Sequence, residues 1–217
     1  MNETKSKIII AVVLGVFTVI SLALVLPSMG GETSVMNVLE TINPSDPTIK
    51  FGSSEAKAVL IEYSDFECPA CSYVSQNIIE PVIAKEIEGF QFVFKHFPLI
   101  SIHPKAVDSA IASESAHRQG KFFEMKKILF ARQDEWRNAS DANQLFIEYA
   151  KELSLDIEVF ENDLYSRELR DKINKAYDFG RANGLNSTPT LLLNGKKISV
   201  NSSAKLEELI LAEISEN

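Results

Sequence analysis

The stretch EYSDFECPAC, residues 62–71, contains both cysteines of this 217-residue chain. It overlaps the end of an apolar run, residues 58–63, which is typical of a buried strand. Helical spacing follows over residues 72–87. Pro69 suits the first position of a helix, because its missing N–H is one of the donors left unpaired there. Cys68 is therefore expected at the N-cap of a helix that follows a strand directly.

Two cysteines spaced in this way at a helix start predict redox chemistry. Free backbone N–H groups and the helix dipole stabilise a thiolate at the N-cap, so we expect a lowered pKa for Cys68. Cys71 lies one turn deeper, where it can attack a mixed disulfide held on Cys68 and release the partner. A purely structural disulfide would close a tiny loop and stabilise the fold by only about 2 kcal/mol. A metal site would need two more ligands, and the histidines 96, 103 and 117 have no metal-ligand spacing.

Glu62 interrupts the apolar run six residues before Cys68. Strand alternation places Glu62 and Ser64 on one face of the strand. Burial would raise the pKa of Glu62 toward neutrality, so that it could take the proton from Cys71 when that thiol must attack. The alternative is a carboxylate at a strand end that reaches water or pairs with Lys95.

Asp65 and Glu67 lie closer to the cysteines in sequence than Glu62 does. We expect both in an exposed loop, where their charge opposes thiolate formation slightly. Solvated or core positions are expected for the three histidines.

The remaining periodicities predict an α/β sandwich with a long helical insertion. Asn194-Gly195 predicts a type I′ hairpin turn, Gly184 a helix C-cap and Ser203 an N-cap. The order of elements is β-α-β, several helices, then β-β-α, with the insertion over about residues 104–183. The expected strands are 58–63, 90–97, 190–193 and 196–200, and the expected helices 72–87, 104–118, 122–132, 141–153, 157–165, 168–183 and 203–214.

The first thirty residues predict a membrane anchor or signal segment. Residues 8–26 contain no charge and would form a helix of roughly 28 Å, the thickness of a bilayer core. Lys5 and Lys7 precede this stretch, which favours an extracytoplasmic location for everything after it. Ser28-Met29-Gly30 could instead serve as a signal-peptide cleavage site. Residues 31–48 are expected to form a linker, and residues 49–217 the globular domain.

Composition excludes several other classes of protein. Lys and Arg number 22 against 30 Asp and Glu, for a net charge of −8, and such an acidic surface repels nucleic acid. Two cysteines cannot build a disulfide-dense scaffold or a zinc site of four thiolates.

A second motif, STPTLLLNGK at residues 187–196, contains Pro189 directly before an expected strand. From the residues alone, this is either a plain turn proline or a cis-proline that would point the Thr188 backbone toward an incoming peptide. Together with EYSDFECPAC, however, the motif resembles the thioredoxin superfamily. The stretch HPKAVDSAIASESAHRQGKFFEM, residues 103–125, resembles its DsbA-like branch of thiol-disulfide oxidoreductases. The resemblance covers residues 49–217.

The resemblance implies a thioredoxin-like fold and a role for each residue of the site. Cys68 would be the exposed nucleophile, Cys71 the resolving thiol, and the two would form the redox disulfide. Glu62 would be the buried acid, and Pro189 a cis-proline facing the cysteines. Substrate contacts would come from Thr188, Pro189, Pro69, Ala70 and Phe66. No metal or cofactor is implied.

The implied activity is disulfide exchange with exported protein or peptide thiols, in the oxidase direction. Re-oxidation would use a membrane partner of the DsbB or vitamin K epoxide reductase-like type. The second residue of the central dipeptide is Ala70, whereas strongly oxidising members have histidine there, which leaves a reductase or isomerase as an alternative. Another alternative is a chaperone or adaptor that binds peptides without redox chemistry. We expect a monomer anchored in the cell membrane by one helix, or a secreted protein if residues 1–30 are cleaved.

Overall fold

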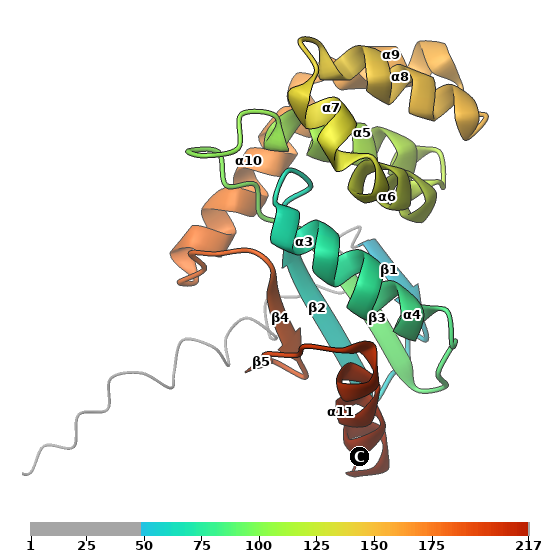
Figure 1. The fold of residues 1–217 in the computed structure, drawn as a ribbon, viewed down its shortest axis with the longest axis vertical. Coiled ribbons are helices and arrows are strands. Elements are labelled where there is room, and N and C mark those ends of the chain that lie inside the picture. The colour runs from blue at the N-terminus through green and yellow to red at the C-terminus, as the bar shows by residue number, and fades with distance from the viewer. Residues whose placement is uncertain (1–48, 217) are drawn as a thin grey trace, which may run out of the picture. The chain divides into compact units, whose positions relative to one another are not determined.

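A five-stranded sheet lies at the centre of the fold. The computed structural model describes residues 49–216, all within one compact unit. The strand order is β1-β3-β2-β4-β5 (Figure 1). The central β2 (Ala58–Ser64) runs parallel to β3 (Phe90–His96) and antiparallel to β4 (Thr190–Leu193). The edge strands β1 (Ile49–Gly52) and β5 (Lys196–Ile198) are both antiparallel to their neighbours.

The helices form three groups along the chain. After β2 the chain forms one continuous helical stretch with a π-helical middle: α3 (Pro69–Val74), η1 (Ser75–Ile79) and α4 (Glu80–Ile83). After β4 and β5, α11 (Ser203–Glu216) ends the fold. The insertion between β3 and β4 consists of α5 (Ala106–Arg118), α6 (Phe122–Ala131), α7 (Gln133–Asn138), α8 (Ala142–Glu152), α9 (Ile157–Leu164) and α10 (Arg167–Ala182).

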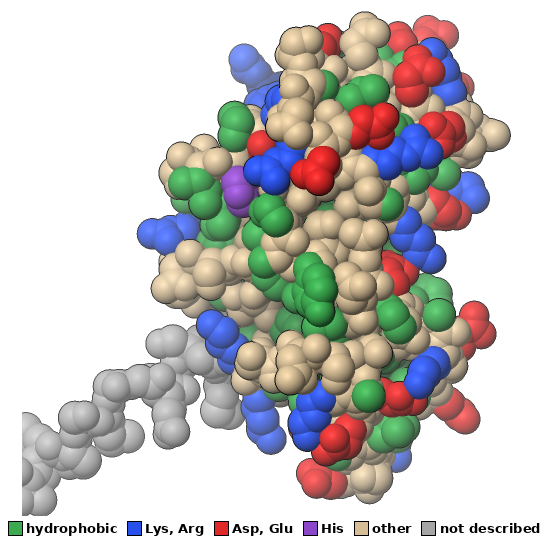
Figure 2. Space-filling model, in the orientation of Figure 1, with side chains coloured by type: hydrophobic (Ala, Val, Ile, Leu, Met, Phe, Trp, Pro, Cys, Tyr) green, Lys and Arg blue, Asp and Glu red, His purple; other side chains and the backbone are tan. Residues whose placement is uncertain are grey.

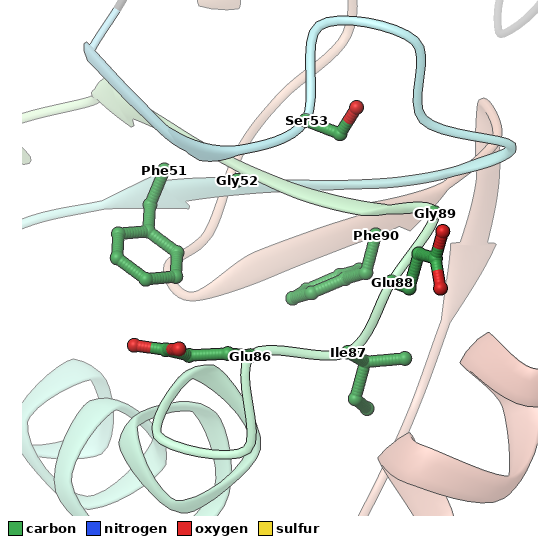
Figure 3. Close-up of a pocket in the computed structure, with 8 residues that line it drawn as sticks. All are labelled: Phe51, Gly52, Ser53, Glu86, Ile87, Glu88, Gly89 and Phe90. Atoms are coloured by element: carbon green, nitrogen blue, oxygen red, sulfur yellow. The ribbon is translucent and has the colours of Figure 1, made fainter.

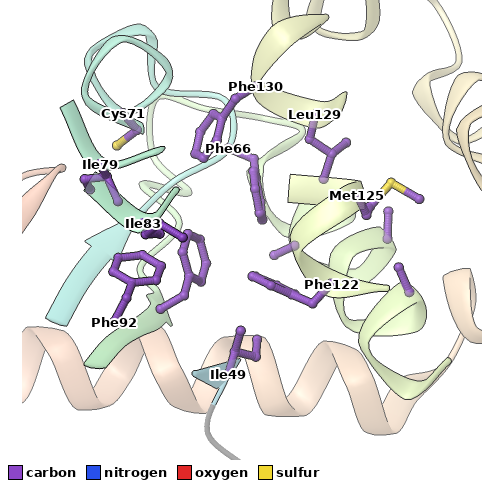
Figure 4. Close-up of a cluster of buried hydrophobic side chains, with 14 of the residues drawn as sticks. Ile49, Phe66, Cys71, Ile79, Ile83, Phe92, Phe122, Met125, Leu129 and Phe130 are labelled. Carbon is purple, nitrogen blue, oxygen red and sulfur yellow. The ribbon is translucent and has the colours of Figure 1, made fainter. Parts of the chain in front are cut away.

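The two faces of β2 lie in two separate apolar clusters. Leu60 belongs to the larger cluster, which runs from Cys71 through the phenylalanines of β3 to the insertion helices (Figure 4). Ile61 and Tyr63 belong to a smaller cluster on the other face, where α10 packs. Gly180 lets α10 approach closely, because a Cβ there would lie 2.5 Å from the Phe97 ring.

Most of the predicted elements are present, with shifts at their ends. The Asn194-Gly195 turn has two positive φ angles, 44° and 77°, as a type I′ turn requires, and Gly184 has a φ of 80° after α10. The helix expected at residues 72–87 begins three residues earlier, at Pro69, and its last α-helical segment ends at Ile83.

Three details of the fold were not predicted correctly. The expected N-cap of α11, Ser203, is instead its first helical residue, and the Ser202 hydroxyl accepts the Lys205 N–H at 3.2 Å. The strand β1 was missed because only four residues form it, next to the linker. The short helix α7 was missed because six residues give too little periodicity.

The predicted anchor (residues 1–30) and linker (residues 31–48) lie outside the described residues. No helix within residues 49–216 is both long and apolar enough to span a bilayer. A pocket of about 380 Å³ is lined by residues 51–53 and 86–90 (Figure 3). These residues lie at the N-terminal end of β3, so the pocket is at the opposite end of the sheet from the cysteines.

Candidate active site

Cys68 is the N-cap residue of α3, at the end of the loop that follows β2. Its backbone is extended (φ −78°, ψ 120°), and Pro69 takes the first helical position. The first helical hydrogen bond runs from the Ser72 N–H to the Cys68 carbonyl at 3.1 Å. The backbone N–H groups of the first turn are therefore free to face the Cys68 sulfur. Both cysteines are free thiols.

Hydrogen bonds to the Cys68 sulfur lower the pKa of Cys68 to about 5. The largest contribution is the hydrogen bond from the Cys71 thiol, which opposes the effect of burial. Thr188 and the N–H groups of Cys71 and Ala70 add smaller contributions. Cys68 is thus a thiolate at neutral pH, which is the nucleophilic form.

Cys71 differs from Cys68 in burial and in pKa. The Cys71 side chain is fully buried, whereas Cys68 is 7% exposed. Cys68 is therefore less exposed than predicted, but it is the more accessible of the two cysteines. Burial raises the pKa of Cys71, and the neighbouring Cys68 and Glu62 raise it further. Cys71 therefore stays protonated while Cys68 is ionised, and it needs a base before it can attack.

Glu62 lies fully buried on the same face of β2 as Ser64. Burial raises its pKa, an effect opposed by the charge of Lys126 and by the Ser64 hydroxyl. The alternative of a water-exposed carboxylate is wrong, since no part of Glu62 reaches solvent. Pairing with Lys95 is disfavoured as well, because the register sets Lys95 opposite Tyr63, whose side chain lies on the other face.

Ser64 connects Glu62 to the buried cysteine. Its Oγ donates to Glu62 Oε1 at 2.7 Å. The same hydroxyl stabilises the thiolate form of Cys71. A hydroxyl can donate one hydrogen bond while it accepts another, which is the property that a proton relay between Glu62 and Cys71 would need. The other carboxylate oxygen, Glu62 Oε2, has no hydrogen-bond partner within the described residues.

The loop before β4 faces Cys68 from the other side. The Thr188–Pro189 peptide bond is cis. The Thr188 carbonyl oxygen lies 3.6 Å from the Cys68 sulfur, and the buried Thr188 hydroxyl has no partner that meets hydrogen-bond geometry among residues 49–216. Pro69 and Ala70, which follow Cys68, are exposed, so these two residues and the Thr188–Pro189 peptide lie around one accessible sulfur.

Phe66 does not lie on the surface of the site, so its expected contact with substrate is a wrong prediction. Its side chain is 1% exposed, with its ring centroid 5.3 Å from that of Phe94 and 4.8 Å from that of Phe130. The ring is buried because α6 of the insertion covers this part of the sheet (Figure 4).

Asp65 and Glu67 are also buried, at 2% and 4% exposure, in contrast to the expected exposed loop. Asp65 Oδ2 accepts from the Leu99 N–H at 2.8 Å and contacts His103 Nδ1 at 2.6 Å. Glu67 Oε2 accepts from the Lys105 N–H at 2.6 Å. Both carboxylates therefore fix the loop that contains Cys68 to the segment after β3. The main causes of the lowered Cys68 pKa do not include either carboxylate.

Gln133 of α7 was not identified from the sequence, although it contacts the same loop. Its amide donates to the carbonyls of Phe66 at 2.6 Å and Cys68 at 3.0 Å. A lone glutamine at the start of a six-residue helix offers no sequence pattern that would reveal this role. Of the other histidines, His96 lies in the core, 3.3 Å from Glu114, and burial lowers the pKa of His117. No cluster of three potential metal ligands occurs within residues 49–216.

The raised pKa of Glu62 predicts how stability depends on pH. A raised pKa means that the folded state favours the protonated acid. That stabilisation is complete below about pH 4.5, where unfolded Glu62 is also protonated, and is lost as the pH rises through the folded pKa. Glu62→Gln has no charge to bury. Urea unfolding of the reduced proteins should show the variant gaining stability relative to wild type as the pH rises from about 4 to about 8. A difference that stays constant over this range would contradict the assignment.

Comparisons with known proteins identify the family and the fold of the chain. The family model described as Thioredoxin matches residues 44–212. A protein named Na(+)/H(+) antiporter NhaA 1, from Mycolicibacterium gilvum, is 37% identical over 166 residues, which are 75% of this chain and 25% of that protein. Na(+)/H(+) antiporter NhaA 3 from Salinispora tropica is 31% identical over 78% of this chain and 25% of its own length. The chain thus spans about a quarter of the length of the curated relatives it matches.

Solved structures of DsbA-like proteins have the same fold. The α-DsbA1 of Wolbachia pipientis superposes with a TM-score of 0.70 at 21% identity, over 82% of this chain and 96% of that one. BdbD from Bacillus subtilis in its oxidised form gives 0.67 at 21% identity, over 77% and 93%. MdbA from Corynebacterium diphtheriae, a thiol-disulfide oxidoreductase, gives 0.62 at 16% identity, over 78% and 90%. The chain therefore belongs to the thioredoxin family, and its helical insertion gives it the DsbA-like fold of thiol-disulfide oxidoreductases.

Proposed function

We propose that this chain is an extracytoplasmic protein thiol-disulfide oxidoreductase that oxidises the cysteines of exported proteins through its CPAC motif. The observation that carries the proposal is the placement of Cys68 at the start of α3. There the Cys71 thiol and the N–H groups of Cys71 and Ala70 stabilise its thiolate, and the Thr188 carbonyl beside the cis Thr188–Pro189 bond lies 3.6 Å from its sulfur.

The lowered pKa of Cys68 supports the oxidase direction. At pH 7 a thiol with a pKa of about 5 is almost fully ionised, whereas one with a pKa near 9 is not. This ionisation stabilises the reduced protein, which makes the disulfide form more oxidising. A pKa of about 5 lies between that of the nucleophilic cysteine in DsbA, about 3.5, and that in thioredoxin, about 7. Ala70 in place of the histidine is consistent with this intermediate value.

Oxidation of a substrate begins from the Cys68–Cys71 disulfide. A substrate thiolate attacks the Cys68 sulfur, forms a mixed disulfide and displaces Cys71 as a thiolate. Protonated Glu62 then supplies a proton to Cys71 through the Ser64 hydroxyl. A second substrate thiolate attacks the substrate sulfur of the mixed disulfide and displaces Cys68 as a stabilised thiolate. The substrate has lost two electrons, and the Cys68–Cys71 pair has gained them.

Re-oxidation reverses the roles of the two cysteines. The Cys68 thiolate attacks a disulfide of the oxidising partner, which we propose to be a membrane protein of the DsbB or vitamin K epoxide reductase-like type. Cys71 loses its proton to Glu62 through Ser64 and displaces the partner from Cys68. This step needs an ionised Glu62, whereas the substrate step needs a protonated one. The raised pKa of Glu62 favours the substrate step, and the charge of Lys126, which opposes that shift, favours re-oxidation.

The surface around Cys68 fits an extended peptide segment with apolar side chains. Thr188 and Pro189 offer backbone groups beside the sulfur, where a peptide strand can pair. Exposed apolar side chains lie on the elements next to the site: Tyr73 on α3, at 58% exposure, and Ile102 in the segment after β3 that is bonded to the Cys68 loop, at 66%. On the face shown in Figure 2, hydrophobic side chains gather over the middle of the molecule, around α3.

Substitution of each cysteine tests the chemistry. Cys68→Ala should abolish both insulin reduction and the oxidation of a dithiol peptide, because no thiolate remains accessible. Cys71→Ala should accumulate mixed disulfides with substrates, visible by mass spectrometry, because nothing displaces them from Cys68. Full activity of Cys68→Ala would end the proposal. A peptide-binding function that survives serine at both positions would instead favour the chaperone or adaptor.

The equilibrium potential against glutathione tests the direction of electron flow. We expect a value between about −120 mV, as in DsbA, and about −270 mV, as in thioredoxin. The reason is that the Cys68 thiolate is stabilised more than in thioredoxin and less than in DsbA. A potential at or below that of thioredoxin would assign the chain to reductases instead.

The location of the domain is part of the proposal, and the uncharged stretch at residues 8–26 after Lys5 and Lys7 supports it. The full chain expressed in a bacterium should sediment with membranes, and protease added to spheroplasts should digest its domain. A shorter, soluble form outside the cells would indicate cleavage near residue 30. A domain that resists protease until the membrane is lysed would contradict the extracytoplasmic assignment.

A further inference from the structure

Lys126 of α6 is a fully buried lysine that takes no direct part in the proposed chemistry. Its ammonium bonds to Ser75 Oγ at 2.8 Å and to Glu80 Oε1 at 2.6 Å. It also lies over the rings of Phe92, at 5.5 Å from the centroid, and Phe130, at 5.7 Å. Removing a charge from water is costly even when the charge is paired, so an ion pair in this position is weak evidence for stability. A second role would explain why a charge lies here.

The strand register places this ammonium on the same face of the sheet as Glu62. Phe92 pairs with Leu60, and the next residue of β3 on the same face, Phe94, pairs with Glu62. A group over the Phe92 ring is therefore on the diagonal from Glu62 across β2 and β3. The carboxylate of Glu62 has one buried oxygen, Oε2, without a hydrogen bond within residues 49–216.

Other charged groups around Glu62 do not replace Lys126. Glu80 of α4 is an anion and opposes ionisation of Glu62. Cys71 of α3 is a weak acid that gives a proton. His96 of β3 shares the face, but it is 3.3 Å from the buried Glu114 of α5. Of the charged groups in residues 49–216 that act on Glu62, Lys126 is the one that stabilises its carboxylate.

We propose that Lys126 is a positioning residue of the redox site, whose buried ammonium keeps Glu62 able to ionise when Cys71 must lose its proton. This inference rests on the proposed role of Glu62 as proton acceptor. Ser75, in the π-helical turn η1, and Glu80 hold the ammonium in place. The helical insertion thus supplies a charge to chemistry that takes place on the thioredoxin-like sheet.

The two half-reactions should respond differently to loss of this charge. Without Lys126, the pKa of Glu62 rises further, so a smaller fraction of Glu62 is ionised. A protonated Glu62 can still give a proton to Cys71 during substrate oxidation, but it cannot accept one during re-oxidation. Only the step in which Cys71 displaces a partner from Cys68 should slow.

Lys126→Met tests this asymmetry, with Lys127→Met as its matched control. Lys127 is the next residue and also contacts Glu80, at 3.4 Å, but its side chain is 62% exposed. Reduced protein is mixed with oxidised glutathione, and acid quench with mass spectrometry follows the loss of glutathione from Cys68. We expect Lys126→Met to slow this step about tenfold at pH 7 and to move its pH midpoint upward, since base catalysis is worth more than tenfold. Attack of reduced glutathione on the oxidised variant should keep its wild-type rate.

Two further variants keep the result interpretable. Lys126→Arg should restore the pH profile, because it retains the charge. Lys126→Met with Glu80→Gln removes both charges, so that no anion is left unpaired, and it should still show the upward shift. A wild-type profile in Lys126→Met, or the same shift in Lys127→Met, would overturn the inference.

A direct titration separates this inference from the proposed function. Carboxyl carbons of labelled glutamates report the ionisation of Glu62 by NMR in proteins that need not be active. If the wild-type chain failed to react with glutathione, the proposed function would fail, whereas an upward shift of the Glu62 resonance midpoint in Lys126→Met would still support the electrostatic link. An unchanged midpoint would reject the link whatever the activity.

Discussion

The unpaired N–H groups at the first turn of α3 are the feature on which the site depends. They exist because β2 ends at Ser64 and a helix begins five residues later, with proline in its first position. A thiolate there replaces the water that would otherwise satisfy these donors. The rest of the fold keeps that turn in place: two buried carboxylates fix the loop before it to the segment after β3, and the cis peptide at Thr188–Pro189 lies across from it.

A difference in burial over one helical turn gives the two cysteines distinct chemistry. Cys68 reaches the surface and is surrounded by donors, whereas Cys71 is enclosed between α3 and β2 in the main core. Desolvation alone would raise both pKa values. Hydrogen bonds reverse the effect only at Cys68, so the pair holds one negative charge at neutral pH. In the proposed mechanism, Glu62 accepts or supplies the single proton that is transferred during disulfide exchange.

Local sequence patterns were sufficient for much of the site. Cys68, Cys71 and Glu62 could be placed from a strand, a helix start and period-two alternation, since all three effects act within ten residues. The burial of Asp65 could not be predicted in this way, because its partners come from a segment more than thirty residues later. Phe66 was misplaced for a similar reason, since α6 covers it. Lys126 did have a local indication: it is spaced four residues from both Phe122 and Phe130 on the apolar face of α6.

The hydrogen bonds from Gln133 to the loop of Cys68 join the helical insertion to the reactive sulfur through a single side chain. The Cys68 carbonyl that accepts one of them also begins the helical ladder of α3. A macromolecule that binds α7 would therefore have different affinities for the dithiol and disulfide forms if the turn at Cys68 differs between these forms. Because binding and redox equilibria are linked, a difference in affinity for the two forms shifts the dithiol–disulfide equilibrium of Cys68 and Cys71 by the same factor. Binding at α7 would therefore change the redox potential of the cysteine pair.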